Sequence, residues 1–78
     1  PATYNRLTTS ADKNILAFER SAGGEKVVYI ANLSKNPVEF NVKLDSELQP
    51  YLGKKDFKLA ENGKYSFGPW EYVILQNK

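Results

Sequence analysis

The sequence predicts an all-β fold, a β-sandwich or a partly open barrel of seven to eight short antiparallel strands. Apolar residues recur at every second position in several short runs, which is the period of a strand with one buried face. Segments that contain Gly, Asn, Asp or Pro separate these runs at intervals of about ten residues. Regular spacing of this kind is typical of small sandwiches and barrels.

The composition indicates a single small domain and removes several kinds of chemistry. The chain has 78 residues, of which 41% are hydrophobic, with one Trp, five Tyr and four Phe. It has no Cys, so neither a disulfide nor a thiolate zinc site can stabilise it. It has no His, which excludes a Ser-His-Asp triad and a His-ligated metal. We therefore expect no cofactor and no metal site, and a core held by aromatic packing.

The charge and the hydropathy point to neither nucleic acid nor membrane as a partner. Eleven Lys and Arg oppose nine Asp and Glu, which leaves a net charge of +2. Nucleic-acid-binding domains are usually far more basic. No stretch approaches the ~20 apolar residues that span a bilayer, and the sequence does not open with a signal-peptide pattern.

The N-terminal half predicts three strands and a tight turn. Residues 4–8 are the first candidate strand. Residues 14–20 follow as a strand whose odd and even positions lie on opposite faces. Gly23 and Gly24 predict a hairpin turn, because glycine accepts positive φ. Residues 26–33 are apolar at nearly every position, which predicts a central strand covered on both faces.

Residues 38–44 show the clearest alternation in the sequence, after a turn at residues 32–37. This pattern predicts a half-buried antiparallel strand with its even positions in the core. Residues 45–53 are predicted to be a single turn or a short irregular connection, because Pro50 stops any helix. The inward positions of the alternating strand are Val38, Phe40, Val42 and Leu44.

The C-terminal part predicts three further short strands. Residues 57–60 form the first, and the Asn-Gly pair at residues 62–63 is a strong hairpin signal. That turn leads into a return strand at residues 65–67. The Gly-Pro pair at residues 68–69 then breaks the chain, and residues 70–76 form the last strand.

Five segments carry a resemblance that extends over about residues 4–76. They are NILAFER at residues 14–20, KVVYIANLS at 26–34, the alternating strand at 38–44, the apolar stretch at 51–53 followed by 57–59, and YSFGPWEYVIL at 65–75. In this order and at this spacing they resemble the C-terminal β-domain of the α-amylase family of glycoside hydrolases.

The resemblance implies that residues 1–78 form one β-sandwich domain with a Greek-key connection, excised from the C-terminus of a larger glycoside hydrolase. In that family the catalytic carboxylates lie on a preceding (β/α)8 barrel, and none of the barrel's motifs occurs here. The implied role is non-catalytic: to stabilise and shield the barrel of an enzyme that acts on α-glucans, with a secondary contact to starch. The sequence leaves the compartment open; a bacterial parent, secreted or periplasmic, would fit.

Three aromatic residues, Tyr51, Tyr65 and Trp70, are the candidate carbohydrate-binding residues. Each lies beside turn residues, and an exposed ring can stack on the C–H face of a pyranose. For Trp70 the alternative is an anchor in the core or in a domain interface, which the sequence favours. For the two tyrosines the favoured alternative is cross-strand pairing.

Other polar groups have a simpler interpretation than a functional site, and no residue is predicted to be catalytic. The cluster of Lys54, Lys55, Lys58 and Lys64 is expected to be solvated and to protect a sheet edge. The triplet Asn32-Leu33-Ser34 fits an N-glycosylation acceptor, but a turn in which side chains bond to nearby backbone explains it as well. A glycosidase uses a pair of carboxylates. No spacing typical of such a pair is found among Glu19, Glu39, Asp56 and Glu71.

The sequence is also compatible with two other functions. A free-standing module that binds carbohydrate or protein would show exposed aromatic residues on one face. An OB-like barrel for single-stranded nucleic acid needs aromatic residues interleaved with Lys and Arg in one groove. Residues 26–33 have an aromatic residue without flanking positive charge, which ranks this last function lowest.

Overall fold

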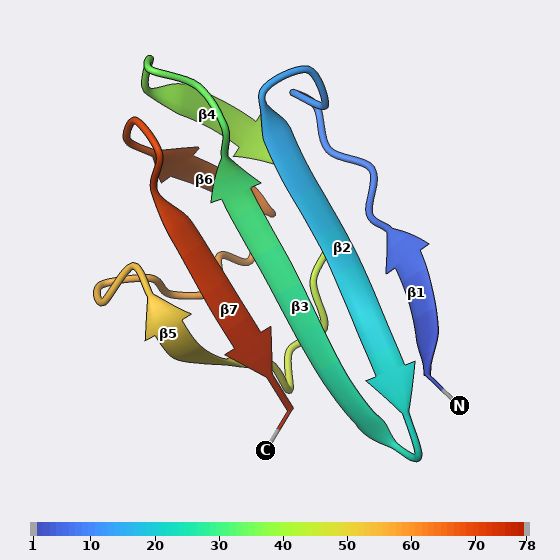
Figure 1. The fold of residues 1–78 in the computed structure, drawn as a ribbon. Helices are drawn as coiled ribbons and strands as arrows, with labels where there is room; N and C mark the ends of the chain where they lie inside the picture. Colours follow the sequence, from blue (N-terminus) through green and yellow to red (C-terminus); the bar gives the residue numbers. More distant parts are fainter. Residues whose placement is uncertain (1, 78) are drawn as a thin grey trace.

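The chain folds into a sandwich of two antiparallel sheets (Figure 1). The computed structural model describes residues 2–77, which contain seven strands and no helix. This part of the chain accordingly offers no long apolar helix that could cross a membrane. The predicted all-β sandwich is confirmed. The strands are β1 (Thr3–Arg6), β2 (Ile15–Ala22), β3 (Glu25–Asn32), β4 (Val38–Asn41), β5 (Gln49–Gly53), β6 (Lys64–Phe67) and β7 (Tyr72–Gln76).

Five strands make the large sheet in the order β1-β2-β3-β7-β5, and β4 pairs with β6 in a small sheet behind it (Figure 1). All neighbouring strands are antiparallel. The first three strands follow one another as a meander, whereas every later connection crosses from one sheet to the other. These crossings bring the last strand, β7, between β3 and β5.

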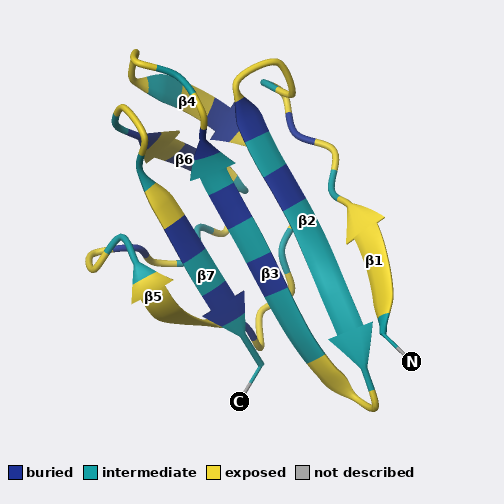
Figure 2. Cartoon of the chain, in the orientation of Figure 1, coloured by how far each residue is buried: buried dark blue, intermediate teal, exposed yellow. Residues whose placement is uncertain are grey.

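Buried residues alternate with more exposed ones along β2, β3 and β7 (Figure 2). The core fills the space between the two sheets, and aromatic rings dominate its small-sheet side. The rings of Phe40 and Phe67 meet edge to face with centroids 5.2 Å apart. The ring of Phe57 stacks on that of Tyr65 at 5.1 Å. The large sheet contributes alternate residues of its three central strands. The buried hydrophobic residues are Ile15, Ala17, Val28, Ile30, Phe40, Val42, Leu48, Phe57, Tyr65, Phe67, Val73 and Leu75.

The hairpin between β2 and β3 has the predicted form. Ala22 pairs with Glu25 across a two-residue loop, and the φ angles of Gly23 and Gly24 are 56° and 86°. Two successive positive φ angles are those of the hairpin turn whose twist matches the flanking strands. The glycine pair therefore fixes the register of β2 on β3.

β3 is a central strand of its sheet, as predicted, but only one of its faces is covered. Val28 and Ile30 are each 1% exposed, because the small sheet lies over them. Val27, Tyr29 and Ala31 alternate with them and are only half-buried. The expected burial of both faces is wrong for residues 2–77, since no second layer lies on the outer side of the large sheet.

The expected irregular connection at residues 45–53 is wrong in its second half. The Leu48 N–H donates to the Asp45 carbonyl and closes a turn, but Gln49–Gly53 then forms β5 at the edge of the large sheet. An edge strand needs ladder hydrogen bonds on one side only, which is why Pro50 is accepted there. The ladder with β7 is irregular between Pro50 and Leu52, as in a β-bulge.

The expected strand at residues 57–60 is also wrong. Phe57 reaches the core from a loop, so the apolar character of this segment reflects burial without a ladder. The predicted turn is present, since Gly63 has a φ of 70° and its N–H donates to the Ala60 carbonyl at 3.0 Å. However, β6 leaves this turn to pair with β4 rather than with the segment before it.

Candidate functional site

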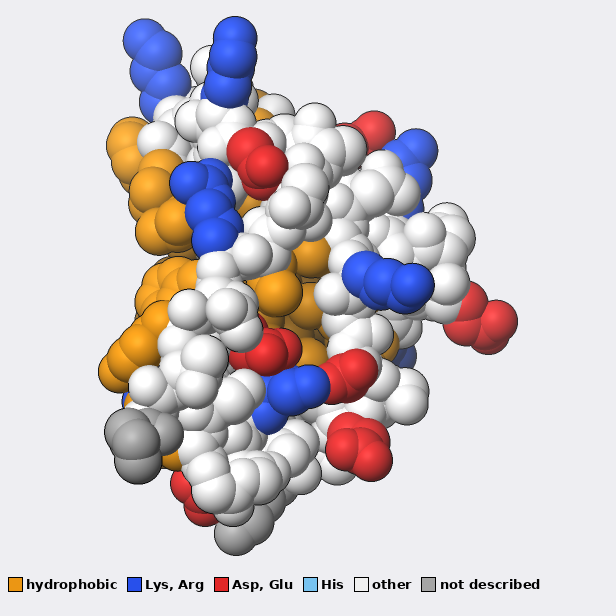
Figure 3. All heavy atoms as spheres, turned by 90° about the vertical axis from the view of Figure 1, so that its right-hand side faces the viewer, with side chains coloured by type: hydrophobic (Ala, Val, Ile, Leu, Met, Phe, Trp, Pro, Cys, Tyr) orange, Lys and Arg blue, Asp and Glu red, His pale blue; other side chains and the backbone are white. Residues whose placement is uncertain are grey.

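The outer face of the large sheet is apolar along its middle. Tyr29 of β3 lies between Phe18 of β2 and Ile74 of β7 as cross-strand neighbours, and the rings of Phe18 and Tyr29 stack with centroids 4.7 Å apart. Figure 3 views the sandwich from the β1 side and shows hydrophobic side chains gathered along this face, at the left of the picture. We use the name outer face for its six half-buried residues, Leu16, Phe18, Val27, Tyr29, Ala31 and Ile74.

The outer face is bordered by more exposed apolar residues on the β5 side and by an arginine on the β1 side. Leu52 is the partner of Ile74 on β5, and Tyr72 is the partner of Ala31, so the apolar surface continues toward the β5 edge. On the opposite edge, Arg6 of β1 is the partner of Phe18. An apolar centre with a polar rim is the usual anatomy of a protein interface.

Trp70 lies in the turn between β6 and β7, because the last strand starts at Tyr72 rather than at residue 70. Its φ of 60° is the one positive φ outside glycine in the described chain. Its side chain is 63% exposed. Its N–H donates to the Ser34 carbonyl at 3.2 Å. A bulky residue in this region of φ is strained, and neighbouring contacts must hold it there.

The side chain of Asn32 provides part of that support. Its Nδ2 donates to the carbonyl of Gly68 at 2.9 Å and to that of Asn36 at 2.8 Å. Its Oδ1 accepts from the Ser34 N–H and from the Ser34 hydroxyl. Asn32 is fully buried. The turn expected from the triplet at residues 32–34 is confirmed, and its asparagine is committed to the turn rather than open to glycosylation.

Lys54 and Glu71 close the same turn from the β5 side. Glu71 Oε1 accepts the Gly68 N–H at 2.6 Å, and both carboxylate oxygens lie 3.2 Å from Lys54 Nζ. Burial lowers the pKa of Lys54, but the ion pairs with Glu71 and then Asp56 outweigh it, and the net shift is upward. Lys54 is thus half-buried and paired, unlike the solvated edge lysine that the sequence suggested.

Two of the three candidate aromatic residues lie in neighbouring hollows that share residues 53–55. One hollow, of about 420 Å³, is lined by Trp70 and Tyr72. The other, of about 250 Å³, is lined by Tyr51 and Leu52. Tyr51 is 61% exposed at the irregular part of β5. Tyr51 and Trp70 thus line hollows that meet at residues 53–55.

The third candidate, Tyr65, lies in the core. It is 7% exposed, it pairs with Phe40 across β4 and β6, and its ring stacks on Phe57. Its hydroxyl oxygen accepts the Ala60 N–H at 3.1 Å. Tyr65 thus has the cross-strand position that was its alternative interpretation, and it leaves no ring face for a sugar.

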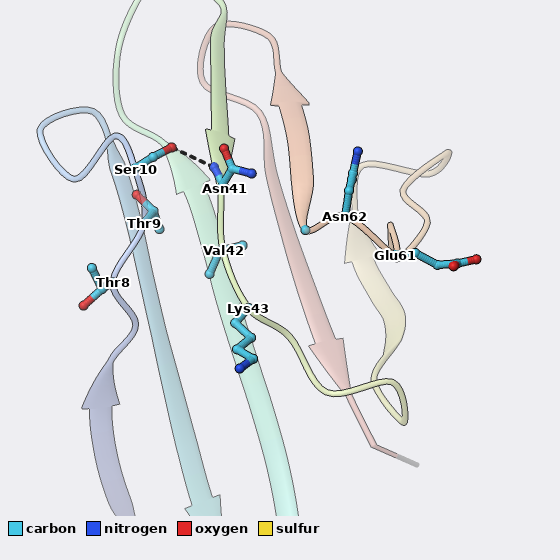
Figure 4. A pocket seen from close by; sticks show the side chains of 9 residues that line it. Thr8, Thr9, Ser10, Asn41, Val42, Lys43, Glu61 and Asn62 are labelled. Carbon is cyan, nitrogen blue, oxygen red and sulfur yellow. Dashed lines mark hydrogen bonds between the residues drawn. The ribbon is translucent and has the colours of Figure 1, made fainter.

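Another hollow, of about 580 Å³, lies where residues 8–10 meet the end of β4 (Figure 4). The Asn41 N–H donates to the Ser10 hydroxyl at 2.8 Å, which ties the two segments together. Figure 4 shows Thr8 and Glu61 pointing in opposite directions away from the hollow. Because its polar side chains do not converge on a common point, we assign no chemistry to it.

The candidate carboxylates are used in ion pairs or face solvent. Glu71 and Asp56 share Lys54, Glu19 lies 3.7 Å from Lys26 Nζ, and Glu39 is exposed on β4. Within residues 2–77, no three acidic side chains come together in a way that could hold a metal ion.

The comparison with protein families agrees with this architecture. The model of the maltogenic amylase C-terminal domain matches residues 6–74, a stretch that contains the outer face, the turn around Asn32 and the two hollows at residues 53–55. No curated protein matches the chain. Since the family match covers most of the sequence, the chain belongs to the family of maltogenic amylase C-terminal domains, which are C-terminal domains of α-amylase-family enzymes.

Proposed function

We propose that this chain is the non-catalytic C-terminal domain of an enzyme that acts on α-glucans, and that its outer face covers the enzyme's catalytic (β/α)8 barrel. Family membership supports the presence of a catalytic domain in the same polypeptide. The observation that carries the proposal is the outer face, with its stacked Phe18 and Tyr29 and no covering layer within residues 2–77. A sheet that is apolar on both faces needs a layer on each.

The physical role of the contact is to remove apolar surface from water on both partners. Interfaces between domains of one chain usually bury about 600–1,500 Å². The outer face is central in the large sheet, since it lies on β2, β3 and β7. A barrel that rests on it would be stabilised by this burial and shielded from solvent and proteases on that side.

Ile74→Lys tests the packing proposal in the whole polypeptide that carries this domain. The ammonium of a lysine at the centre of the contact would be removed from water, so we expect a fall of several degrees in the melting temperature and faster proteolysis between the two domains. Ser66→Lys is the matched control, because Ser66 is exposed on β6 in the small sheet. An equal melting temperature for the two variants would contradict the packing.

The same pair of variants in the 78-residue chain separates packing within the domain from packing against the barrel. A lysine at position 74 of the isolated chain can extend its ammonium into solvent while its stem stays on the sheet. We therefore expect a much smaller loss of stability there than in the whole polypeptide.

A secondary contact with starch is the second part of the proposal. It is supported by the exposure of Tyr51 and Trp70 in neighbouring hollows. Retardation of the polypeptide in a native gel that contains starch or maltodextrin measures this contact. Unchanged mobility with and without polysaccharide would remove it.

A further inference from the structure

We infer that residues 53–55 form the floor of a binding track for a neutral α-glucan segment, with Trp70 at one end and Tyr51 at the other. The inference rests on the proposed function for the class of ligand, and it names the site where that ligand binds. Four observations carry it: a strained and exposed indole, a balanced set of charges, a segment at residues 53–55 that is fixed against β7, and a second exposed ring in the hollow that shares this segment.

The side chain of Trp70 is largely outside the core of the domain, although its backbone is held in an unfavourable conformation. Its φ of 60° is unfavourable for a bulky side chain, and its indole is 63% exposed. The hydrogen bond from Trp70 N–H to Ser34 and the contacts of Asn32 with Gly68 hold the turn in this form. Strain that is maintained to expose an aromatic ring indicates a ligand for that ring.

The charges beside the indole favour a neutral ligand. Lys54 and Lys55 contribute two positive charges, and Asp56 and Glu71 contribute two negative charges, so the local sum is zero. Lys54 Nζ lies 3.3 Å from Asp56 and 3.2 Å from Glu71. A phosphate or another polyanion would find no net attraction here. Ammonium and carboxylate groups at the side of an aromatic ring are suited to the hydroxyl groups of a sugar.

Gly53 lets residues 53–55 lie close against β7. Its φ is 96°, and a Cβ at this position would lie 2.3 Å from the Tyr72 carbonyl oxygen. The Lys54 N–H donates to that same oxygen at 2.8 Å, which fixes residues 53–55 against β7. Residues 53–55 line both the hollow of Tyr51 and the hollow of Trp70, so the close fit of this segment on β7 gives the two hollows a common, fixed floor.

Affinity electrophoresis of the whole polypeptide in gels with increasing soluble starch tests the track. The variants are Trp70→Ala, Tyr51→Ala and the double variant. Tyr4→Ala is the matched control, because Tyr4 is also 63% exposed but lies on β1 at the far edge of the sheet. Starch binding by the catalytic domain contributes equally to the retention of all four variants. We expect a three- to tenfold weaker apparent affinity for each single variant, a larger loss for the double variant and no change for Tyr4→Ala. Equal retention of all variants would overturn the inference.

Trp70→Gly distinguishes a ligand-binding role from a structural one. Glycine accepts the positive φ, so we expect starch retention to fall as in Trp70→Ala while the melting temperature stays equal or rises. A lower melting temperature together with unchanged retention would overturn the inference and make Trp70 an anchor for the catalytic domain. The Ile74→Lys experiment tests the packing on the barrel independently of the track. If only Ile74→Lys behaves as expected, the packing is supported and the track is wrong. If only the Trp70 and Tyr51 variants behave as expected, the track is supported and the packing is wrong.

Discussion

Asn32 shows how one buried polar side chain can join segments that are distant in the sequence. It ends β3, and its amide group holds the carbonyls of Asn36 and Gly68, the second of which lies in the turn before β7. Its own N–H donates to the Glu71 carbonyl at 2.8 Å. A buried amide with this many partners leaves unpaired groups behind when it is removed.

Asn32→Ala is expected to lower the free energy of unfolding by about 1–3 kcal/mol, because it leaves partly buried carbonyl and N–H groups without their partner. Urea denaturation followed by tryptophan fluorescence measures the loss. Asn41→Ala is the control, since Asn41 is exposed at the end of β4 and should change stability by less than about 0.5 kcal/mol. Equal effects of the two substitutions would contradict the structural role of Asn32.

Asp12 gives the loop before β2 a pH dependence. The N–H and then the hydroxyl of Thr9 hold the pKa of the Asp12 carboxyl below its ordinary value, since both donate to Oδ1 at 2.9 Å. A lowered pKa in the folded state means that this contribution is complete above the unfolded pKa and is lost as the pH falls through the folded pKa.

We therefore expect faster amide exchange at Thr9 and Ala11 as the solution is acidified below about pH 4. Exchange measured by NMR over a pH series, corrected for the intrinsic pH dependence, checks this. In Asp12→Asn the corrected rates should be high at all pH values and should show no acid transition. A transition of unchanged size in that variant would assign the effect to another carboxylate.

At the scale of elements, β5 depends on a glycine whose conformation and whose lack of a side chain are both required. Gly53 has a positive φ and lies against the Tyr72 carbonyl oxygen, whereas Gly24 has a φ of 86° with no atom within 4 Å of the place of a Cβ. The two positions therefore separate the effect of conformation from the effect of a clash.

Gly24→Ala is expected to cost about 1–2 kcal/mol, the usual penalty for a left-handed conformation with a Cβ. Gly53→Ala should cost clearly more, because the methyl group must in addition push β5 away from β7. Urea denaturation of both variants gives the comparison. A smaller loss for Gly53→Ala than for Gly24→Ala would mean that β5 contributes little to the folded state.

The segment at residues 57–60, unlike β5, stabilises the fold by side-chain packing and not by ladder hydrogen bonds. Phe57 stacks on Tyr65 and meets Phe67 with centroids 6.2 Å apart. Phe57→Ala is expected to cost about 3–5 kcal/mol, as for other buried phenylalanines. The exposed neighbour gives the control, since Lys58→Ala should stay within about 0.5 kcal/mol. Calorimetry of the two variants measures both values.

The elements that could be predicted are those whose signal is local. The glycine pair at residues 23–24 sets a turn between sequence neighbours, and the structure confirms it. The alternation at residues 38–44 predicts a strand, which is confirmed for residues 38–41 only, although Val42 is still buried beyond the end of β4. The errors at residues 49–53 and 57–60 have a different cause. An edge strand with a proline and an apolar loop in the core differ only in what lies beside them.

At the scale of the whole molecule, residues 2–77 cover one face of the large sheet and leave its other face open. The small sheet has two strands, and it covers the inner side of β2, β3 and β7 with aromatic residues. The apolar run at residues 26–33 is explained by this arrangement only if a further layer covers the outer face. The proposed contact with the catalytic barrel supplies that layer from the same polypeptide.

The candidate site could be predicted in part from the sequence. Tyr51, Tyr65 and Trp70 all lie beside turn residues, so their local patterns are alike, and yet only Tyr65 is buried. The pairing of β6 with β4 turns that ring inward. The contribution of Lys54 and Glu71 to the Trp70 turn has no local signal, because the two residues lie 17 positions apart.

The sequence by itself determined the class of the fold, the segments of its strands other than β5, its two glycine-dependent turns and its lack of thiol and imidazole chemistry. These properties follow from residue types and from contacts between neighbours along the chain. Only the tertiary structure decided which strands pair, which face of β3 stays uncovered and which aromatic rings reach solvent. Those properties depend on crossings between the two sheets, which bring together residues that the sequence keeps far apart.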